Sequence, residues 1–344
     1  MAIVGHWSSL SEAQKLVQDV LLAGVVEEII EEGQLLSMLP VFSIDGKTVK
    51  YNRESSLPSA AFYDIGEQLV WTADVNYTAQ VTAELKRVAR QDVLDKFMAQ
   101  TYKNPNDYRS IVISELRKGC MRTIEDKILY GDSVNVSAKE FDGLHYLVAA
   151  QTGDLNIDEG EGPLSLMNIR KMLDAMKISA VGKAKTILLM PKEIARRIDA
   201  YVQEAGLASW VGPASIVFAP NELGQRVTWF DGIPIIRSDY LVAEQVNTGL
   251  TQATARAKYS SGTKQYSIFC VRFGQILEGG VSMGFGGEDG GGGAGDFFRM
   301  EFFDKLEDYD AEGIRLVAYC CLALGATLSL ARIADVTDAA VTAS

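Results

Sequence analysis

The chain has 344 residues, of which 47% are hydrophobic and 23% charged, a balance that provides a sizeable core and excludes wholesale disorder. Its 33 basic and 45 acidic residues give a net charge of −12, which argues against a protein that grips nucleic-acid phosphates. The four cysteines match neither a zinc site nor a secreted disulfide framework, so we expect reduced thiols.

The first predicted element is an amphipathic helix over residues 11–32. Apolar residues recur there at helical spacing, and the segment ends at Gly33 after a cluster of four glutamates. Negative charge at the carboxyl end of a helix opposes the helix dipole. We therefore expect this helix to depend on packing against another surface.

An extended excursion is predicted from about residue 41 to residue 80. The Asp45-Gly46 pair lies between alternating residues, a pattern typical of a tight β-hairpin. Residues 75–86 alternate apolar and polar side chains over twelve positions, which predicts a long strand with one solvated face. The excursion has few residues of its own for a core, so it should lie on another surface.

A long helix is predicted over residues 105–130. Asn104 and Pro105 form a favourable helix start, and Tyr130-Gly131 ends the pattern. Its narrow apolar stripe suits a helix that crosses a sheet, and comprises Ile113, Leu116, Cys120, Ile124 and Ile128.

The second half of the chain is predicted to be mixed α/β. Helices are expected at about 164–177 and from Pro191 onward, with a Gly-rich loop at 284–295. Strands are expected at 186–190, 215–218, 227–230, 233–236, 266–273, 297–303 and 314–322. Residues 316–331 are uncharged but shorter than the roughly 20 residues of a membrane-spanning helix. We favour a buried strand followed by a core segment, and expect no membrane association.

No motif for chemistry survives inspection. Residues 280–284 match G-x-S-x-G, but glycines follow instead of a helix, and both histidines precede Ser282 in the chain. The Gly-rich run lacks the Lys-Ser/Thr pair of a phosphate loop. His145, beside apolar residues, is interpreted as structural. We expect no catalytic, cofactor-binding or metal-binding residues, and an arm, a rod-like helix and an α/β body suggest an assembly subunit.

Several segments, in order over nearly the whole chain, resemble the major capsid proteins of tailed bacteriophages of the Hong Kong 97 type. Residues 49–54 with Leu57-Pro58 resemble the outgoing strand of the extended loop, and 75–86 its return. Residues 105–130 resemble the spine helix, and Phe141-Asp142-Gly143-Leu144 the turn that follows it. Residues 188–191, 230–235 and 238–240 resemble the axial domain. Residues 271–274 and the closing strands resemble the end of the chain in this family.

The resemblance implies an α+β fold of the Hong Kong 97 type, with an N-terminal arm, an extended β-hairpin loop, a spine helix, a peripheral domain and an axial domain. The implied division places the arm with its amphipathic helix at 1–40 and the extended loop at 41–75. The peripheral domain would comprise 76–155 and 297–322, and the axial domain 156–296 and 323–344.

The implied function is structural: hexamers and pentamers that tile an icosahedral shell around double-stranded DNA, without sequence-specific binding. Implied partners are a portal protein, a decoration protein and, because few residues precede the loop, a separate scaffolding protein. Assembly would take place in the host cytoplasm and the product would be the virion capsid. An encapsulin-like nanocompartment shell and a mixed α/β enzyme are the alternatives. Aromatic and arginine side chains are enriched at interface cores; the predicted intersubunit contacts are Tyr51, Arg53, Phe62 and Tyr63.

Overall fold

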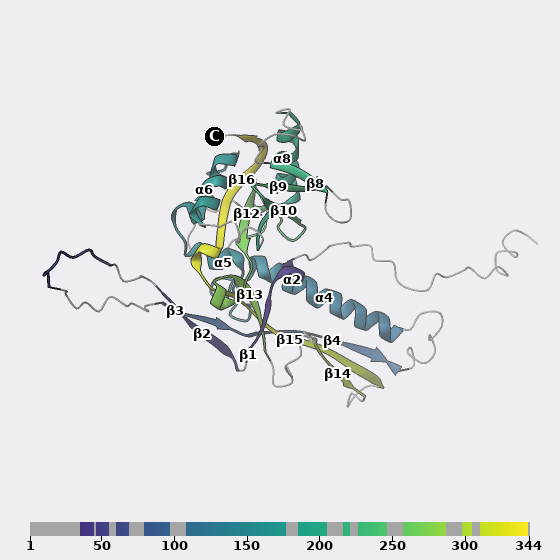
Figure 1. Cartoon of the computed structure of the whole chain (residues 1–344). Coiled ribbons are helices and arrows are strands. Elements are labelled where there is room, and N and C mark those ends of the chain that lie inside the picture. Colours follow the sequence, from purple (N-terminus) through teal and green to yellow (C-terminus); the bar gives the residue numbers. More distant parts are fainter. Residues whose placement is uncertain are drawn as a thin grey trace, which may run out of the picture.

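A computed structural model shows a central body with extensions on two sides (Figure 1). It describes residues 35–44, 46–54, 60–68, 79–96, 108–176, 185–204, 216–220, 226–245, 257–286, 298–304 and 310–342. The helix predicted over 11–32 and the predicted start of the long helix at Asn104-Pro105 lie outside these residues. The described strands form a five-stranded sheet, a nine-stranded sheet and a two-stranded hairpin.

The five-stranded sheet is organised around β15 (Ala311–Leu324). One edge of β15 pairs antiparallel with β14 (Arg299–Phe303) and β13 (Val281–Gly286). The other edge pairs with β4 (Lys86–Asp95) through ten consecutive residue pairs. The polar segment of β4 was not predicted as a strand, because its backbone partners are far away in the sequence. Its pairing with β15 explains why it is extended.

The helix α4 (Tyr108–Tyr130) lies along this sheet (Figure 1). Val112, Leu116 and Cys120 pack against Leu94 of β4 and two β15 residues, Ile314 and Leu316. The predicted helix is confirmed for its described part. Four of its five predicted stripe residues are buried, whereas Ile113 is only partly buried.

The nine-stranded sheet has a core on each face. Its main path is β5 (Asn156–Asp158), β16 (Leu330–Thr342), β12 (Lys264–Arg272), β7 (Thr186–Pro191), β10 (Ile233–Ser238), β9 (Arg226–Phe230) and β8 (Ile216–Pro220), with β11 (Glu244–Gln245) on β12 and β6 (Pro163–Ser165) on β16. Leu188 and Met190 of β7 face one core, with α6 (Leu166–Ala175) and α8 (Lys192–Glu204). Ile187 and Leu189 face the other, with α4 and α5 (Leu144–Ala149). Burial on both faces accounts for the continuous apolar run in β7.

The shorter elements connect these layers. The helix α2 (Leu35–Met38) packs on the core beside α4, with Leu35 and Leu39 buried. Short 3-10 turns lie at η1 (Gly153–Leu155), η2 (Ile276–Glu278) and η3 (Thr327–Ser329). Residues 316–331, interpreted as a buried strand and a core segment, form the end of β15, η3 and the start of β16.

Three further points of the prediction need correction. The segments flanking Asp45-Gly46 do not form a tight hairpin: among the residues described, β1 (Val41–Ile44) pairs in parallel with β13 instead. The predicted Gly-rich loop begins too early, because Gly284 and Gly286 belong to β13. A Cβ on Gly284 would lie 2.5 Å from Ile44 Cδ1, so glycine permits the close approach of β1. The thirteen-residue strand β16 was not predicted at all.

The hairpin of β2 (Thr48–Arg53) and β3 (Ala79–Glu84) projects from the body toward the left of Figure 1. Six antiparallel residue pairs join the two strands, from Thr48 with Glu84 to Arg53 with Ala79. Within this pairing Ala83 is buried and Thr82 exposed, as the predicted alternation of 75–86 requires. The remainder of that alternating segment, 75–78, lies outside the described residues.

Candidate assembly surfaces

The root of the hairpin is fastened to the end of β15 by two side chains of β2. The hydroxyl of Tyr51 donates to the carbonyl oxygen of Leu324 at 2.5 Å. Arg53 donates from Nη2 to the same oxygen at 2.5 Å and from Nε to Gly325 O at 2.8 Å. Because Tyr51 and Arg53 lie two positions apart, they share one face of the strand. Burial raises the pKa of Tyr51, so its hydroxyl remains a donor at neutral pH.

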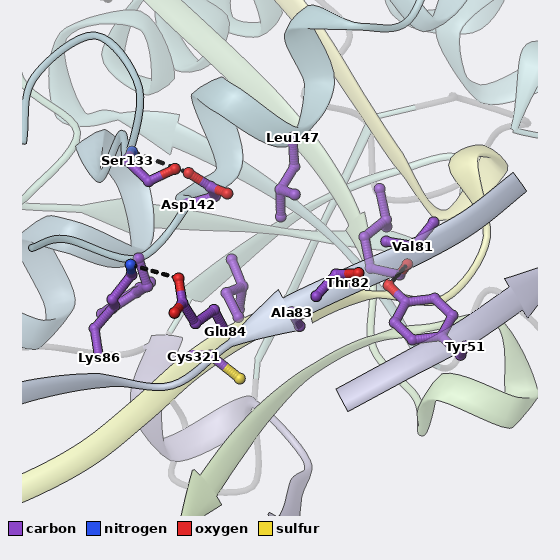
Figure 2. Close-up of a pocket in the computed structure, with 13 residues that line it drawn as sticks. Tyr51, Val81, Thr82, Ala83, Glu84, Lys86, Ser133, Asp142, Leu147 and Cys321 are labelled. Atoms are coloured by element: carbon purple, nitrogen blue, oxygen red, sulfur yellow. Dashed lines mark hydrogen bonds and ion pairs between the residues drawn. The ribbon is translucent and has the colours of Figure 1, made fainter. Parts of the chain in front are cut away.

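A cavity of about 180 Å³ lies beneath the hairpin root. Figure 2 shows its lining side chains coming from the hairpin and the start of β4, from the turn after α4 and from α5, and from β15. The lining mixes polar and apolar residues: Tyr51, Val81, Thr82, Ala83, Glu84, Lys86, Ser133, Phe141, Asp142, Leu147, Cys321, Leu322 and Leu324. Its wall is therefore shared by the projecting hairpin and the body.

Glu84 ends the hairpin in a small charged cluster. Its carboxylate lies 2.6 Å from Lys47 Nζ and 2.7 Å from Lys86 Nζ. Hydrogen bonds from these two ammonium groups lower the pKa of Glu84 to about 2. Lys86, the first residue of β4, also donates to the carbonyl oxygen of Ala138 at 2.9 Å, so the charged cluster links the end of the hairpin to the turn after α4.

The described part of the loop, residues 60–68, lies far from the body (Figure 1). Asp64 and Glu67 close a turn there, with Asp64 N–H donating to Glu67 Oε2 at 2.9 Å and Glu67 N–H donating to Asp64 O at 3.1 Å. Phe62 and Ile65 are 106% and 108% exposed, and Tyr63 is 43% exposed. The described part of the loop therefore presents large apolar side chains to solvent.

The four predicted contact residues therefore fall into two groups. Tyr51 and Arg53 bond within the chain, at the hairpin root. Phe62 and Tyr63 lie on the exposed loop. Sequence reasoning missed Ile65, although the Ile-Gly pair between two acids is a turn pattern that would present it outward.

The helix α2 is fixed to α4 by a buried carboxylate that sequence reasoning also missed. Oε1 of Glu125 accepts the backbone N–H of Leu36 at 2.8 Å, and Glu125 is 3% exposed. Burial raises the pKa of Glu125, although hydrogen bonds from the Leu36 and Leu35 backbone act in the opposite direction. A carboxylate at the start of a helix satisfies N–H groups that have no partner within the helix.

The residues screened for chemistry lie in structural positions. Ser282 is the second residue of β13 and 1% exposed, not on the strand-to-helix turn that a nucleophilic serine requires. The four cysteines are free and buried, and burial raises the pKa of Cys320 to about 12. Over the described ranges, no three His, Cys, Asp or Glu residues are grouped to hold a metal ion. Over the same ranges, no helix is long and apolar enough to cross a membrane.

Comparison with known proteins gives agreement in structure alone. No family model and no curated protein matches the chain. The holo-SrpI encapsulin complex from Synechococcus elongatus PCC 7942 matches with a TM-score of 0.67 at 14% identity, over 98% of this chain and 99% of that one. The capsid of a native GTA particle matches with a TM-score of 0.63 at 11% identity, over 97% and 100%. The capsid of cyanophage P-SCSP1u matches with a TM-score of 0.61 at 11% identity, over 99% and 100%.

The chain has the Hong Kong 97-type capsid fold. Matches that span nearly the full length of both chains include the projecting hairpin and both sheets, so the predicted α+β fold class is confirmed. In the terms of this fold, the β2–β3 hairpin carries the extended loop and α4 is the spine helix. The five-stranded sheet beneath α4 includes β1 and β13, which come from distant parts of the chain.

Proposed function

We propose that the chain is the major capsid protein of a tailed bacteriophage, a structural subunit without catalytic activity. The observation that carries the proposal is the extended loop. Its root is fastened to the body by Tyr51 and Arg53, while its described outer part presents Phe62 and Ile65 to solvent. A two-stranded hairpin is marginally stable by itself, so the projecting part gains stability by lying on another molecule. Another copy of the chain is the partner that an icosahedral shell supplies.

The proposed contacts differ in role. Phe62 and Tyr63 would lie against a neighbouring subunit, together with Ile65. Tyr51 and Arg53 would act through the hairpin, whose direction their bonds to Leu324 and Gly325 fix. Many modest interfaces hold such a shell, so each extended loop must project in the right direction. One misdirected loop would weaken every ring of subunits that contains it.

The proposed assembly is a shell of hexamers and pentamers around double-stranded DNA, formed in the host cytoplasm and retained in the virion. The implied domain division of 1–40, 41–75, 76–155 with 297–322, and 156–296 with 323–344 is part of this proposal, as are scaffolding, portal and decoration proteins. A net charge of −12 supports a wall to which packaged DNA does not adhere.

An encapsulin-like nanocompartment shell is the second candidate. The encapsulin from Synechococcus elongatus has a TM-score of 0.67 to this chain. The two capsids described above have TM-scores of 0.63 and 0.61. The two functions differ in content. Purified shells that hold double-stranded DNA support the capsid, whereas shells that hold a co-purifying enzyme support the nanocompartment.

The test of assembly is light scattering after size-exclusion chromatography, followed by negative-stain microscopy, on the full chain and on the Phe62→Ser, Ile65→Ser double variant. We expect the unmodified chain to form rings or shells and the double variant to remain a folded, smaller species. Val134→Ser, in the turn after α4, is the matched control, because Val134 is also exposed, at 71%. Normal shells from the double variant would overturn the role of the loop.

A further inference from the structure

A buried polar cluster joins the spine helix to the nine-stranded sheet. It consists of Tyr130 at the end of α4, His145 in α5, Glu244 in β11 and Arg332 in β16. All four residues are buried, with exposures between 0% and 7%. Charged groups this deeply buried require close partners, since desolvation is otherwise costly. The cluster lies outside the assembly surfaces described above.

The contacts of His145 determine which ring nitrogen carries its proton. Nη1 of Arg332 lies 3.0 Å from His145 Nδ1. A guanidinium group can only donate hydrogen bonds, so Nδ1 must accept and must therefore be unprotonated. The proton of the ring is then on Nε2, which lies 2.9 Å from Oε1 of Glu244. His145 is consequently neutral in this arrangement, between a cation and an anion.

The other members of the cluster have their own partners. Glu244 accepts from the Tyr130 hydroxyl at 3.0 Å and from Ser267 Oγ at 2.7 Å. Arg332 Nε donates to Asn156 Oδ1 at 3.1 Å. Burial and the neighbouring Glu244 raise the pKa of Tyr130 well above its usual range, so Tyr130 remains a donor.

Two aromatic rings hold the imidazole in place. Tyr130 stacks on it with a centroid separation of 4.9 Å, and Phe269 from β12 forms a T-shaped pair with it at a centroid separation of 4.7 Å. Beyond Tyr130, Lys258 Nζ lies 5.2 Å from the tyrosine ring centroid and 2.6 Å from Asp126 Oδ1. The charged and titratable groups around the imidazole are thus Arg332, Glu244 and Tyr130, with Lys258 and Asp126 behind Tyr130.

We propose that His145 is a proton-sensitive lock: its neutral ring holds α5, the end of α4 and the nine-stranded sheet together, and protonation releases them. A second proton, on Nδ1, would place one N–H donor against another and add positive charge 3.0 Å from the Arg332 guanidinium, at a buried site where charges repel more strongly than in bulk solvent. The imidazolium and the guanidinium must then separate. Acidification therefore loosens the junction, a property of the chain itself that does not rest on the proposed function.

The first test measures the unfolding equilibrium constant of the full-length chain by urea titration at pH 7.5 and pH 5.5. If only the unfolded chain accepts the proton, and does so near pH 6.5, this step increases the constant by about tenfold. His145→Gln provides the matched comparison, since an amide can accept from Arg332 and donate to Glu244 without titrating. We expect the variant to lose this tenfold component, while carboxylates that titrate in both chains contribute equally.

The control is His6→Gln, because His6 is the other histidine of the chain. This variant should keep the full pH dependence. Hydrogen exchange, corrected for its intrinsic pH dependence, should show faster exchange of 144–149 at pH 5.5 in the unmodified chain and no such change in His145→Gln. Equal pH dependence of the unmodified chain and His145→Gln would overturn the proposal.

A second measurement covers the case in which His145→Gln does not fold. The imidazole signals of the unmodified chain are followed by NMR from pH 7.5 to pH 5.5, with His6→Gln used to assign them. We expect the His145 signal to stay that of the neutral ring until the junction opens. A normal titration of His145 in the intact fold would refute the lock.

Discussion

The side chain of Arg53 donates to the carbonyl oxygen of Leu324 at 2.5 Å, although 271 positions separate the two residues in the sequence. Leu324 is the last residue of β15, and its carbonyl also accepts the Tyr51 hydroxyl. The same oxygen therefore holds both side chains of the hairpin root. The end of β15 therefore helps to set the direction of the extended loop.

Arg53→Ala should loosen the root of the extended loop. The variant loses two charge-assisted hydrogen bonds, each worth about 1.5–3 kcal/mol where it is shielded from solvent and less at this partly exposed site. We expect faster hydrogen exchange of 48–53 and 79–84 with little change in the nine-stranded sheet. Lys50→Ala is the control, since Lys50 lies on the same strand and is exposed. Equal exchange in both variants would contradict the clamp.

Glu125 should couple the start of α2 to pH. Burial raises the pKa of Glu125, so the folded chain binds this proton more readily than the unfolded chain. The proton-linked stabilisation is then complete below about pH 4.3 and disappears as pH rises through the raised pKa. Glu125→Gln keeps an acceptor for Leu36 and removes the charge, so we expect it to exceed the unmodified chain in stability at pH 7.5.

That advantage of Glu125→Gln should shrink as the pH falls to 4.5, as measured by urea unfolding at both values. Glu125→Ala separates charge from hydrogen bonding, since it leaves the Leu36 N–H without this acceptor. It should destabilise the chain by about 1–3 kcal/mol at either pH. If the stability advantage of Glu125→Gln over the unmodified chain grew as the pH fell, the expected direction of the pH dependence would be wrong.

Gly284→Ala should destabilise the junction of β1 and β13. The added methyl group would lie 2.5 Å from Ile44 Cδ1, 2.8 Å from Phe42 Cζ and 2.9 Å from Cys321 Sγ. Overpacking of this kind costs about 1–3 kcal/mol, measurable by thermal or urea unfolding. Gly119→Ala is the matched control, because no atom lies within 4 Å of its added methyl and alanine favours a helix by about 0.8–1 kcal/mol. Opposite signs are expected for the two substitutions.

The cysteines should report on global unfolding. All four thiols are buried, and a pKa of about 12 for Cys320 leaves it about a thousandfold less thiolate than its usual value of 9.0 would. We expect an aromatic disulfide reagent at pH 8 to label none of them rapidly in the folded chain and all four in denaturant. Rapid labelling of the neighbouring pair Cys320 and Cys321 without denaturant would mean that β15 opens locally.

Elements with a local signal could be predicted from sequence. The period of α4 and the apolar run of β7 are properties of consecutive residues, and both elements are confirmed. The strand β4 could not be predicted, because its polar residues are extended only by their ladder with β15, more than two hundred positions later. β1 was assigned the wrong partner for the same reason. The Asp45-Gly46 pair indicates a turn, but it does not indicate which strand pairs with β1.

The candidate site divides in the same way. The extended loop and its aromatic residues follow from alternation and composition, whereas the bonds of Tyr51 and Arg53 depend on where β15 ends. His145 was interpreted as structural from its apolar neighbours. Its partners Glu244 and Arg332 lie 99 and 187 positions away, so no local pattern could have indicated the cluster.

The position of β16 has a consequence for the order of events during synthesis. This strand lies between β5 and β12, so residues 330–342 fill a gap whose two sides are residues 156–158 and 264–272. A ribosome therefore completes both sides long before it makes the strand that joins them. Until then, the unpaired backbone edges of β5 and β12 are open to incorrect partners. The nine-stranded sheet, and the lock at His145 that depends on Arg332, can form only after translation has passed β16.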